Sequence, residues 1–271
     1  MCRWIAYTGP SLQLDELLIK PTHSLMTQSR HARESTFSIN ADGYGVGWYT
    51  SSSASPGVYH ETRPAWNDEN LRSLASHLSS PLFMSHIRAA TSVVSRTNCH
   101  PFTCDNWMFQ HNGAIGGFDE IRHTLDEAID PRVYAQKRGC TDSETMFGLC
   151  LTEGLRDDPP GAIARMIRRV EGAREAAGVE PPFNMTVAIS DGTTLWAARY
   201  GSAGDGPSLY HTANRAALDQ ASARAGVIEA ASTIVVSEPL DDCGRHWVEV
   251  PGGHWLQAVG DEVGVSPLPA G

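Results

Sequence analysis

Residues 184–200 read NMTVAISDGTTLWAARY, and this stretch decides the fold class more clearly than any other. Two runs rich in apolar and β-branched residues flank the dipeptide Asp191-Gly192, which favours the tight turn of a β-hairpin. The stretch therefore predicts two neighbouring antiparallel strands. Toward the N-terminus, three segments with helical periodicity precede it, at 117–129, 142–155 and 160–177.

Strand patterns lie on both sides of these helices. They occupy 2–8, 44–50, 57–63, 81–90 and 106–111 before the helices, and 231–237 and 253–258 after the hairpin. An order of strands, then helices, then antiparallel strands favours an α+β layered domain over a doubly wound parallel sheet.

The composition is that of an ordinary globular protein. Hydrophobic residues make up 41% and charged residues 19% of the 271 residues. The formal net charge of −10 disfavours nucleic acid and anionic membrane surfaces as partners. The N-terminus, MCRWIAYTGP, lacks a signal-peptide pattern, and no apolar run approaches the roughly 20 residues that span a bilayer. Six cysteines in so long a chain do not suggest a disulfide framework, so we expect a reduced, cytoplasmic protein.

Cys2 is the first candidate for chemistry. A small second residue permits removal of Met1, which leaves a thiol and a free α-amine on one residue. The reference pKa is about 8.5 for the thiol and about 7.7–8.0 for the amine. One residue could therefore supply both a nucleophile and its general base. A cysteine at position two is usually accidental, so this hypothesis depends on the residues that follow.

His111-Asn112-Gly113 follows a predicted strand and has two interpretations. Asn-Gly is a common turn dipeptide. Alternatively, the Asn112 side-chain amide and the Gly113 backbone N–H could stabilise the oxyanion that forms when a nucleophile attacks a carbonyl. The dipeptide alone leaves both interpretations open.

Two charged residues could bind a substrate. Arg88 lies among apolar neighbours in SHIRAAT (85–91), and its planar guanidinium matches a carboxylate with two hydrogen bonds. Asp142 lies in Thr141-Asp142-Ser143-Glu144, which also reads as a helix N-cap with an acidic first turn. The functional interpretation adds a carboxylate that binds a substrate ammonium.

Six motifs occur in one order along the chain: MCR at 1–3, DGYGVGWY at 42–49, SHIRAAT at 85–91, NCHPF at 98–102, FQHNGAIGG at 109–117 and TDSE at 141–144. In this order they resemble the class II glutamine amidotransferases, a family of N-terminal-nucleophile hydrolases. The hairpin at 184–200 and VVSEPLDD at 235–242 resemble the later part of the stand-alone members.

The resemblance implies a four-layer αββα sandwich formed by a single domain over 1–271. Its motif-bearing core would cover about 2–200, and C-terminal strands would complete the sandwich. Cys2 would be nucleophile and base at the start of a central strand, with Asn112 and Gly113 as the oxyanion hole.

The resemblance also implies how the substrate is held. Arg88, helped by Thr91, would bind the substrate α-carboxylate, and Asp142 would bind its α-ammonium. A loop from Gly43 to Gly47 would close over the pocket. We expect His86 and His111 to support Arg88 and Asn112.

The expected activity is cysteine-dependent cleavage of the γ-glutamyl amide bond of glutamine or of a γ-glutamyl metabolite, through a thioester and without a cofactor or metal. Members that pass ammonia to a synthase often carry an aromatic residue after the Arg and a glycine soon after the Thr. Here those neighbours are Ala89, Ser92 and Val93. The chain is therefore more similar to the stand-alone hydrolases, which include the γ-glutamyl hydrolase of ergothioneine biosynthesis.

Two alternatives remain from the sequence: a glutaminase subunit that delivers ammonia to a separate synthase, and a non-catalytic binding protein with the same fold. A dinucleotide-binding loop at GYGVG is disfavoured, because it lacks the G-x-G-x-x-G spacing and no helix pattern follows it. A metal site at Cys99, His100 and Cys104 is also disfavoured, because no second pair of ligands lies at zinc-site spacing.

Overall fold

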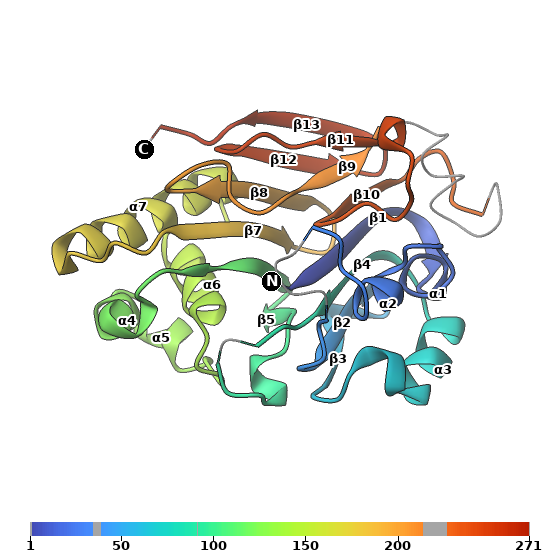
Figure 1. Ribbon diagram of the computed structural model, residues 1–271, viewed down its shortest axis with the longest axis horizontal. Helices are drawn as coiled ribbons and strands as arrows, with labels where there is room; N and C mark the ends of the chain where they lie inside the picture. The colour runs from blue at the N-terminus through green and yellow to red at the C-terminus, as the bar shows by residue number, and fades with distance from the viewer. Residues whose placement is uncertain (1, 35–38, 91, 214–226, 271) are drawn as a thin grey trace.

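Two antiparallel β-sheets face each other in the computed structural model, which describes residues 2–34, 39–90, 92–213 and 227–270 (Figure 1). Sheet A has seven strands within these residues, in the order β11-β9-β10-β1-β4-β2-β3. The strands are β1 (Arg3–Gln13), β2 (Tyr44–Thr50), β3 (Ser53–Glu61), β4 (Ser79–Ile87), β9 (Tyr210–Thr212), β10 (Thr233–Val236) and β11 (Trp247–Glu249).

Sheet B has six strands in the described residues, in the order β13-β12-β8-β7-β6-β5. The strands are β5 (Phe102–Cys104), β6 (Trp107–Ile115), β7 (Phe183–Ser190), β8 (Leu195–Gly201), β12 (His254–Val259) and β13 (Glu262–Pro267). The hairpin that the sequence predicts is confirmed as β7 and β8, with Asp191-Gly192 in the turn and Gly192 at φ +96°.

Helices cover the outer face of each sheet, so the molecule has four layers (Figure 1). On sheet A lie α1 (Asp15–Leu18), α2 (Leu25–Gln28) and α3 (Glu69–His77); on sheet B lie α4 (Phe118–Glu127), α5 (Pro131–Tyr134), α6 (Asp142–Thr152) and α7 (Pro159–Ala177). Short 3₁₀ turns occur at η1 (Ala65–Asn67), η2 (Arg96–Asn98) and η3 (Gly244–His246). The predicted α+β sandwich of αββα type is confirmed.

Three hydrophobic cores hold these layers together. One lies between sheet B and its helices, one between sheet A and its helices, and one between the sheets. The inter-sheet core includes small side chains such as Ala6, Ala188 and Ala197, together with Met84 and Met108. Small residues let the two sheets approach closely, which brings the ends of their strands together.

Capping residues fix the ends of the long helices. The Asp158 side chain accepts a hydrogen bond from Gly161 N at the start of α7, and Pro159 occupies the first turn, where no N–H is needed. Gly178 ends the helix in the left-handed conformation at φ +66°.

The first strand is longer than the sequence predicts. Gly9-Pro10 does not end the first strand, because β1 continues to Gln13 through an irregular register between Thr8 and Leu12. Proline lacks an N–H, and this part of β1 has no pairing with β10, whose register ends at Thr8.

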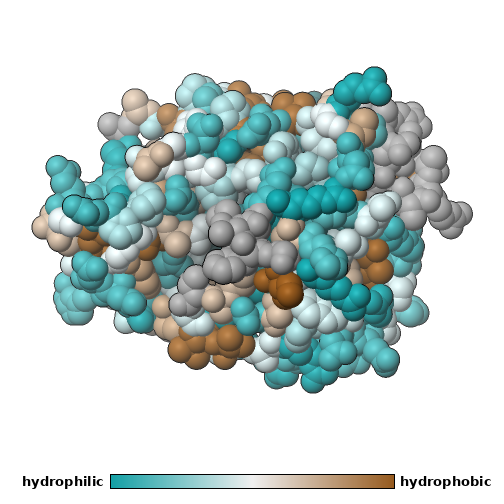
Figure 2. All heavy atoms as spheres, viewed as in Figure 1, coloured by the Kyte–Doolittle hydropathy of each residue, from teal (hydrophilic) through white to brown (hydrophobic). Residues whose placement is uncertain are grey.

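The surface shown in Figure 2 is largely hydrophilic, with apolar side chains in small separate groups. No helix in the described ranges has both the length and the apolar character that crossing a lipid bilayer requires.

Candidate active site

Cys2 lies immediately before β1, the middle strand of sheet A. Arg3 pairs with Ile87 at the end of β4, so Cys2 faces the residues that follow this strand. The Ala89 N–H donates a hydrogen bond to Cys2 Sγ (3.4 Å). The predicted nucleophile is therefore held at the point where two central strands end together.

The pKa of the Cys2 thiol is raised, first because the sulfur is removed from water. The Ala89 N–H and the positive charge of Arg88 lower this pKa, whereas the negative charge of Asp142 raises it. Both ionised side chains therefore lie close enough to the sulfur to act on it. A thiol with a raised pKa needs a base before it can attack a carbonyl.

Buried hydrogen bonds of Arg3 and Glu238 hold the backbone of Cys2 in place. Arg3 Nη1 donates to the Cys2 carbonyl oxygen (2.8 Å), and Arg3 Nε donates to Glu238 (2.6 Å). Both side chains are fully buried. Glu238 also accepts from His23 and from the backbone N–H groups of Arg33 and Glu34. These bonds lower the Glu238 pKa to about 2, although its burial alone would raise it.

Arg88 follows β4 and is 3% exposed. Its guanidinium donates to Val93 O (3.2 Å) and to Ser92 Oγ (2.8 Å), and the described residues give it no carboxylate partner. A buried guanidinium has five N–H donors. Two bonds to neutral oxygens leave this cation without the counter-charge that buried charges require.

Asn112 and Gly113 lie inside β6, not in a turn, because β6 continues to Ile115 and pairs with β7 throughout. Gly113 adopts φ +141°, and a Cβ there would lie 2.0 Å from the Asn184 carbonyl oxygen. Asn112 is fully buried, and neither polar atom of its side chain has a partner among the described residues. A buried amide without a partner is costly, which is typical of a group reserved for a ligand.

Two hydrogen bonds between the sheets bring Asn112 to the Cys2 end of sheet A. Trp4 Nε1 donates to Thr186 Oγ1 (3.2 Å), and Thr186 pairs with Asn112 across β6 and β7. His86 Nε2 donates to the carbonyl oxygen of His111 (3.0 Å). Asn112 thus lies next to residues that contact β1 and β4, the strands that carry Cys2 and Arg88.

The histidines of the site are buried and neutral. Burial lowers the His86 pKa to about 3 and also lowers the pKa of His111. His111 Nδ1 bonds to Ser143 Oγ (2.8 Å), and His86 stacks on His100 with ring centroids 4.1 Å apart. His86 and His111 therefore tie β4, β6 and α6 together through their hydrogen bonds.

Asp142 begins α6 and lies in its acidic first turn, which agrees with the structural interpretation of the sequence. Thr141 caps the helix by accepting from Glu144 N (3.2 Å). Asp142 Oδ1 accepts from Ser143 N (2.7 Å), and Oδ2 accepts from Ile115 N at the end of β6 (3.0 Å). Its carboxylate is half-buried and also acts on the Cys2 pKa, so it faces the same site.

The expectation of a loop from Gly43 to Gly47 that closes over the pocket is wrong, because Tyr44–Gly47 lies inside β2. Gly43 has φ +107°, and its carbonyl accepts from Arg88 N (2.9 Å), so it packs beside the arginine. A Cβ at Gly45 would lie 2.1 Å from the His100 carbonyl oxygen. These glycines permit close packing. Thr91 lies outside the described residues.

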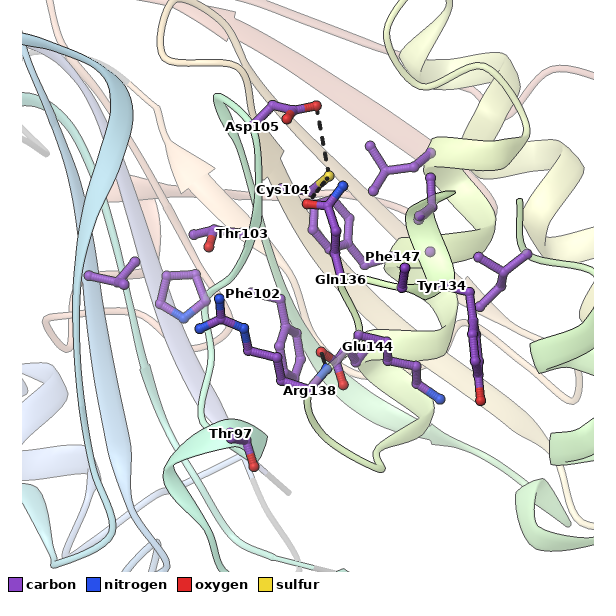
Figure 3. Close-up of a pocket in the computed structure, with 18 of the residues that line it drawn as sticks. Thr97, Phe102, Thr103, Cys104, Asp105, Tyr134, Gln136, Arg138, Glu144 and Phe147 are labelled. Atoms are coloured by element: carbon purple, nitrogen blue, oxygen red, sulfur yellow. Dashed lines mark hydrogen bonds between the residues drawn. The ribbon is translucent and has the colours of Figure 1, made fainter. Parts of the chain in front are cut away.

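A separate cavity of about 720 Å³ lies between β3, β5 and helices α5 and α6 (Figure 3). Its walls include Phe102, Tyr134, Arg138, Glu144 and Phe147. In Figure 3, Cys104 and Gln136 face each other at one end, and Arg138 and Glu144 lie together at the other. Neither Cys2, Arg88 nor Asn112 lines it, so it is distinct from the candidate active site.

Residues 19–266 match the family model described as "Glutamine amidotransferases class-II". The chain belongs to the class II glutamine amidotransferases. It is an enzyme of this family, and the predicted resemblance is confirmed.

Two relatives agree with this assignment, one over part of its length and one over all of it. The chain is 35% identical to the "Probable glutamine amidotransferase DUG3" of Saccharomyces cerevisiae over 228 residues, which are 74% of this chain but only 64% of the yeast protein. It is 24% identical to the "Gamma-glutamyl-hercynylcysteine sulfoxide hydrolase" of Mycolicibacterium smegmatis, over 99% of this chain and 100% of that protein.

Solved structures support the same fold. A glutamine aminotransferase class-II domain protein from Silicibacter pomeroyi is 35% identical, with a TM-score of 0.74, and the match covers 99% of this chain and 100% of that one. The glutamine phosphoribosylpyrophosphate amidotransferase of B. subtilis aligns with a TM-score of 0.62 at 12% identity, over 99% of this class II amidotransferase chain and 50% of that one. The latter shows a shared fold alone.

Three residues at this class II amidotransferase site were not singled out by sequence reasoning: Arg3, Glu238 and Asn98. Each lies inside a motif, MCR, VVSEPLDD or NCHPF respectively. The available signal was a charged or amide side chain next to a buried strand. Apart from the Cys2 and Val93 carbonyls, the hydrogen-bond partners of these three residues lie more than 40 positions away in the chain, so spacing could not reveal them.

Proposed function

We propose that this protein hydrolyses the amide bond of γ-glutamyl compounds, with Cys2 as nucleophile once Met1 is removed. The observation that carries the proposal is that two opposite charges act on the Cys2 thiol: Arg88, a buried cation without a counter-ion among the described residues, and the carboxylate of Asp142. The α-carbon of a γ-glutamyl group carries one carboxylate and one ammonium, which match these two charges.

The recognition step follows from charge and geometry. Arg88 donates from its free N–H groups to the α-carboxylate, and Thr91 assists. Asp142 accepts from the α-ammonium with lone pairs that its bonds to Ser143 N and Ile115 N leave available. With both ends of the amino acid fixed, the γ-carbonyl lies against Cys2 Sγ, next to Gly43.

The reaction has two balanced steps. The α-amine of Cys2 takes the thiol proton, the sulfur attacks the γ-carbonyl, and the negative oxygen accepts from Asn112 Nδ2 and Gly113 N. The C–N bond then breaks as the α-ammonium returns its proton to the leaving amine, which leaves a γ-glutamyl thioester. Water, deprotonated by the same amine, attacks the thioester and releases glutamate and the free thiol.

The comparisons favour a hydrolase over an ammonia donor. One relative that matches this chain end to end is named "Gamma-glutamyl-hercynylcysteine sulfoxide hydrolase", and its match includes the C-terminal strands that complete both sheets. Transfer of ammonia to a separate synthase stays the alternative, since the 35% identical yeast relative is named a probable glutamine amidotransferase.

The experiment that tests the proposal is detection of the acyl-enzyme. The protein is mixed with γ-glutamyl-p-nitroanilide, quenched in acid and measured by intact mass. We expect a species that lacks Met1 and carries one γ-glutamyl group, located by peptide mapping at Cys2. Cys2→Ala should form no adduct and release no p-nitroaniline, while its far-UV circular dichroism stays that of the parent.

Cys243→Ala is the matched control, because Cys243 is also half-buried but its hydrogen bonds to the described residues stay within its own turn. It should keep full activity and the adduct. Turnover by Cys2→Ala, or full activity in protein that retains Met1, would contradict the mechanism. A panel of γ-glutamyl amides, glutamine included, then identifies the preferred leaving amine.

A further inference from the structure

The two charges that recognise the amino-acid end of the substrate come from different layers of the molecule. Arg88 follows β4 in sheet A and bonds to residues 92–93, whereas Asp142 starts α6, a helix on the outside of sheet B. A substrate with both an α-carboxylate and an α-ammonium requires these groups at a fixed separation. Something must therefore hold the 92–93 segment against the start of α6.

Asn98 makes this connection. It is 1% exposed, its Nδ2 donates to Val93 O (2.8 Å), and its Oδ1 accepts from Cys140 N (2.9 Å). Val93 O is also the acceptor of Arg88 Nη1, and Cys140 lies two residues before Asp142. A carbonyl on one side and an N–H on the other fix the orientation of the amide, because only one end of it can donate.

The Cys140 side of this bridge is itself tightly held. Glu144 accepts from the backbone N–H groups of Arg138 (2.8 Å) and Gly139 (2.7 Å), so the segment before α6 cannot shift independently of the helix. Gly139 also packs directly on the bridge, because a Cβ there would lie 2.4 Å from Asn98 Oδ1. Asn98 and the segment before α6 therefore pack directly against each other.

We propose that Asn98 is a positioning residue that sets the distance between the α-carboxylate site at Arg88 and the α-ammonium site at Asp142. It does not touch the substrate. It acts through Val93 O on one side and through Cys140 N on the other. This inference rests on the proposed function, since it assigns Asn98 to the same recognition of a γ-glutamyl group.

The test compares three p-nitroanilides: γ-glutamyl, glutaryl, which lacks the α-amine, and 4-aminobutyryl, which lacks the α-carboxylate. Asn98→Ala should raise KM for the γ-glutamyl substrate roughly tenfold or more, because it removes a buried hydrogen bond on each side. Its kcat should change less than about twofold, since Cys2 and Asn112 keep their contacts, and each analogue should show a smaller rise in KM.

Two further variants separate the two sides of the bridge. Asn98→Asp keeps an acceptor for Cys140 N but replaces the donor to Val93 O. The rise in KM should therefore persist for the glutaryl substrate and vanish for the 4-aminobutyryl substrate. Gly139→Ala should show the opposite pattern, because its Cβ would lie 2.4 Å from Asn98 Oδ1 and 2.7 Å from the Thr97 carbonyl oxygen, so residues 97–98 must move away from Cys140 N. The Gly139 backbone lies outside the left-handed region, so alanine can adopt its φ.

Asn106→Ala is the matched control, since Asn106 also donates from its side chain to a carbonyl, that of Asp191, away from the site. It should leave all three KM values unchanged. If Asn98→Ala raises KM equally for all three substrates, or leaves it unchanged, the positioning role is overturned. If Asn98→Ala fails to fold, Asn98→Asp and Gly139→Ala decide the matter.

The outcome is distinguishable from failure of the proposed function. If Cys2→Ala is inactive and Arg88→Ala loses its preference for an α-carboxylate, the proposed function stands whatever Asn98 does. If Arg88→Ala keeps this preference, the proposed function fails first.

Discussion

At the scale of single residues, a buried polar group without a hydrogen-bond partner indicates a candidate for binding a ligand. Asn112 is one such case, because both polar atoms of its amide are buried and unpaired within the described residues. Its neighbour two positions earlier, Gln110, faces the same side of β6 and donates to Ile5 O (3.0 Å). The two amides therefore provide a comparison between a group with a structural hydrogen bond and one that we propose is reserved for the reaction.

Asn112→Ala should lower kcat by roughly 10²–10³, the usual cost of one lost oxyanion donor, with little change in KM or in thermal stability. Gln110→Ala should instead lower the melting temperature and leave kcat nearly unchanged, because it breaks a hydrogen bond between the sheets. Steady-state kinetics and thermal unfolding of both variants check this. Equal losses of kcat in the two variants would remove Asn112 from the oxyanion hole.

The sequence singled out candidate site residues, but it did not predict their surroundings. Arg88 and Asp142 were recognisable as candidates because a charge beside an apolar strand or at a helix start is informative by itself. Asn112-Gly113 was ambiguous, since the same dipeptide forms turns. Only the pairing of β6 with β7 through Ile115 decides that it is a strand, and that pairing joins residues about 70 positions apart.

At the scale of secondary-structure elements, Glu238 joins the end of β10 to the start of β1 and to residues 33–34. Its pKa is about 2 in the folded protein, below its ordinary value of 4.5. A lowered pKa stabilises the fold above the unfolded-state pKa, and this contribution is lost as the pH falls from about 4.5 toward 2. The shift corresponds to a free energy on the order of 3 kcal/mol.

Glu238→Gln should therefore be destabilised at pH 6 by a few kcal/mol, because it also leaves Arg3 buried without a counter-charge. The difference between the two proteins should shrink at pH 3, where the parent has lost part of its own stabilisation. Urea unfolding at both pH values measures this. A gap that stays constant between pH 6 and pH 3 would refute the assignment of the lowered pKa to Glu238.

The elements themselves were mostly predictable from periodicity. Helices α4, α6 and α7 begin and end within about three residues of the predicted segments, because their caps and apolar stripes are local signals. The extension of β1 past Gly9-Pro10 was not predictable, since it depends on pairing with Ser79 and Ser80 of β4. Short edge strands such as β5 and β9 carry too few residues to show a period.

At the scale of the whole molecule, the closeness of the two sheets sets the limits on substitution. Gly45→Ala should destabilise the protein by about 1–3 kcal/mol, because its Cβ would lie 2.1 Å from a backbone oxygen that cannot yield. Gly172→Ala should stabilise it by about 0.5–1 kcal/mol, since Gly172 lies in the interior of α7 and a Cβ there meets nothing within 4 Å. Thermal unfolding distinguishes them, and equal melting temperatures would contradict the packing argument.

The contact of Asp142 with β6 has an evolutionary consequence. Its carboxylate faces the site and also accepts the Ile115 N–H at the end of the strand that carries Asn112 and Gly113. Under the proposed function, a mutation that alters what this carboxylate binds also loosens the strand that carries Asn112 and Gly113. We therefore expect descendants of this enzyme to exchange one leaving amine for another through loop changes more readily than they exchange the glutamyl half of the proposed substrate.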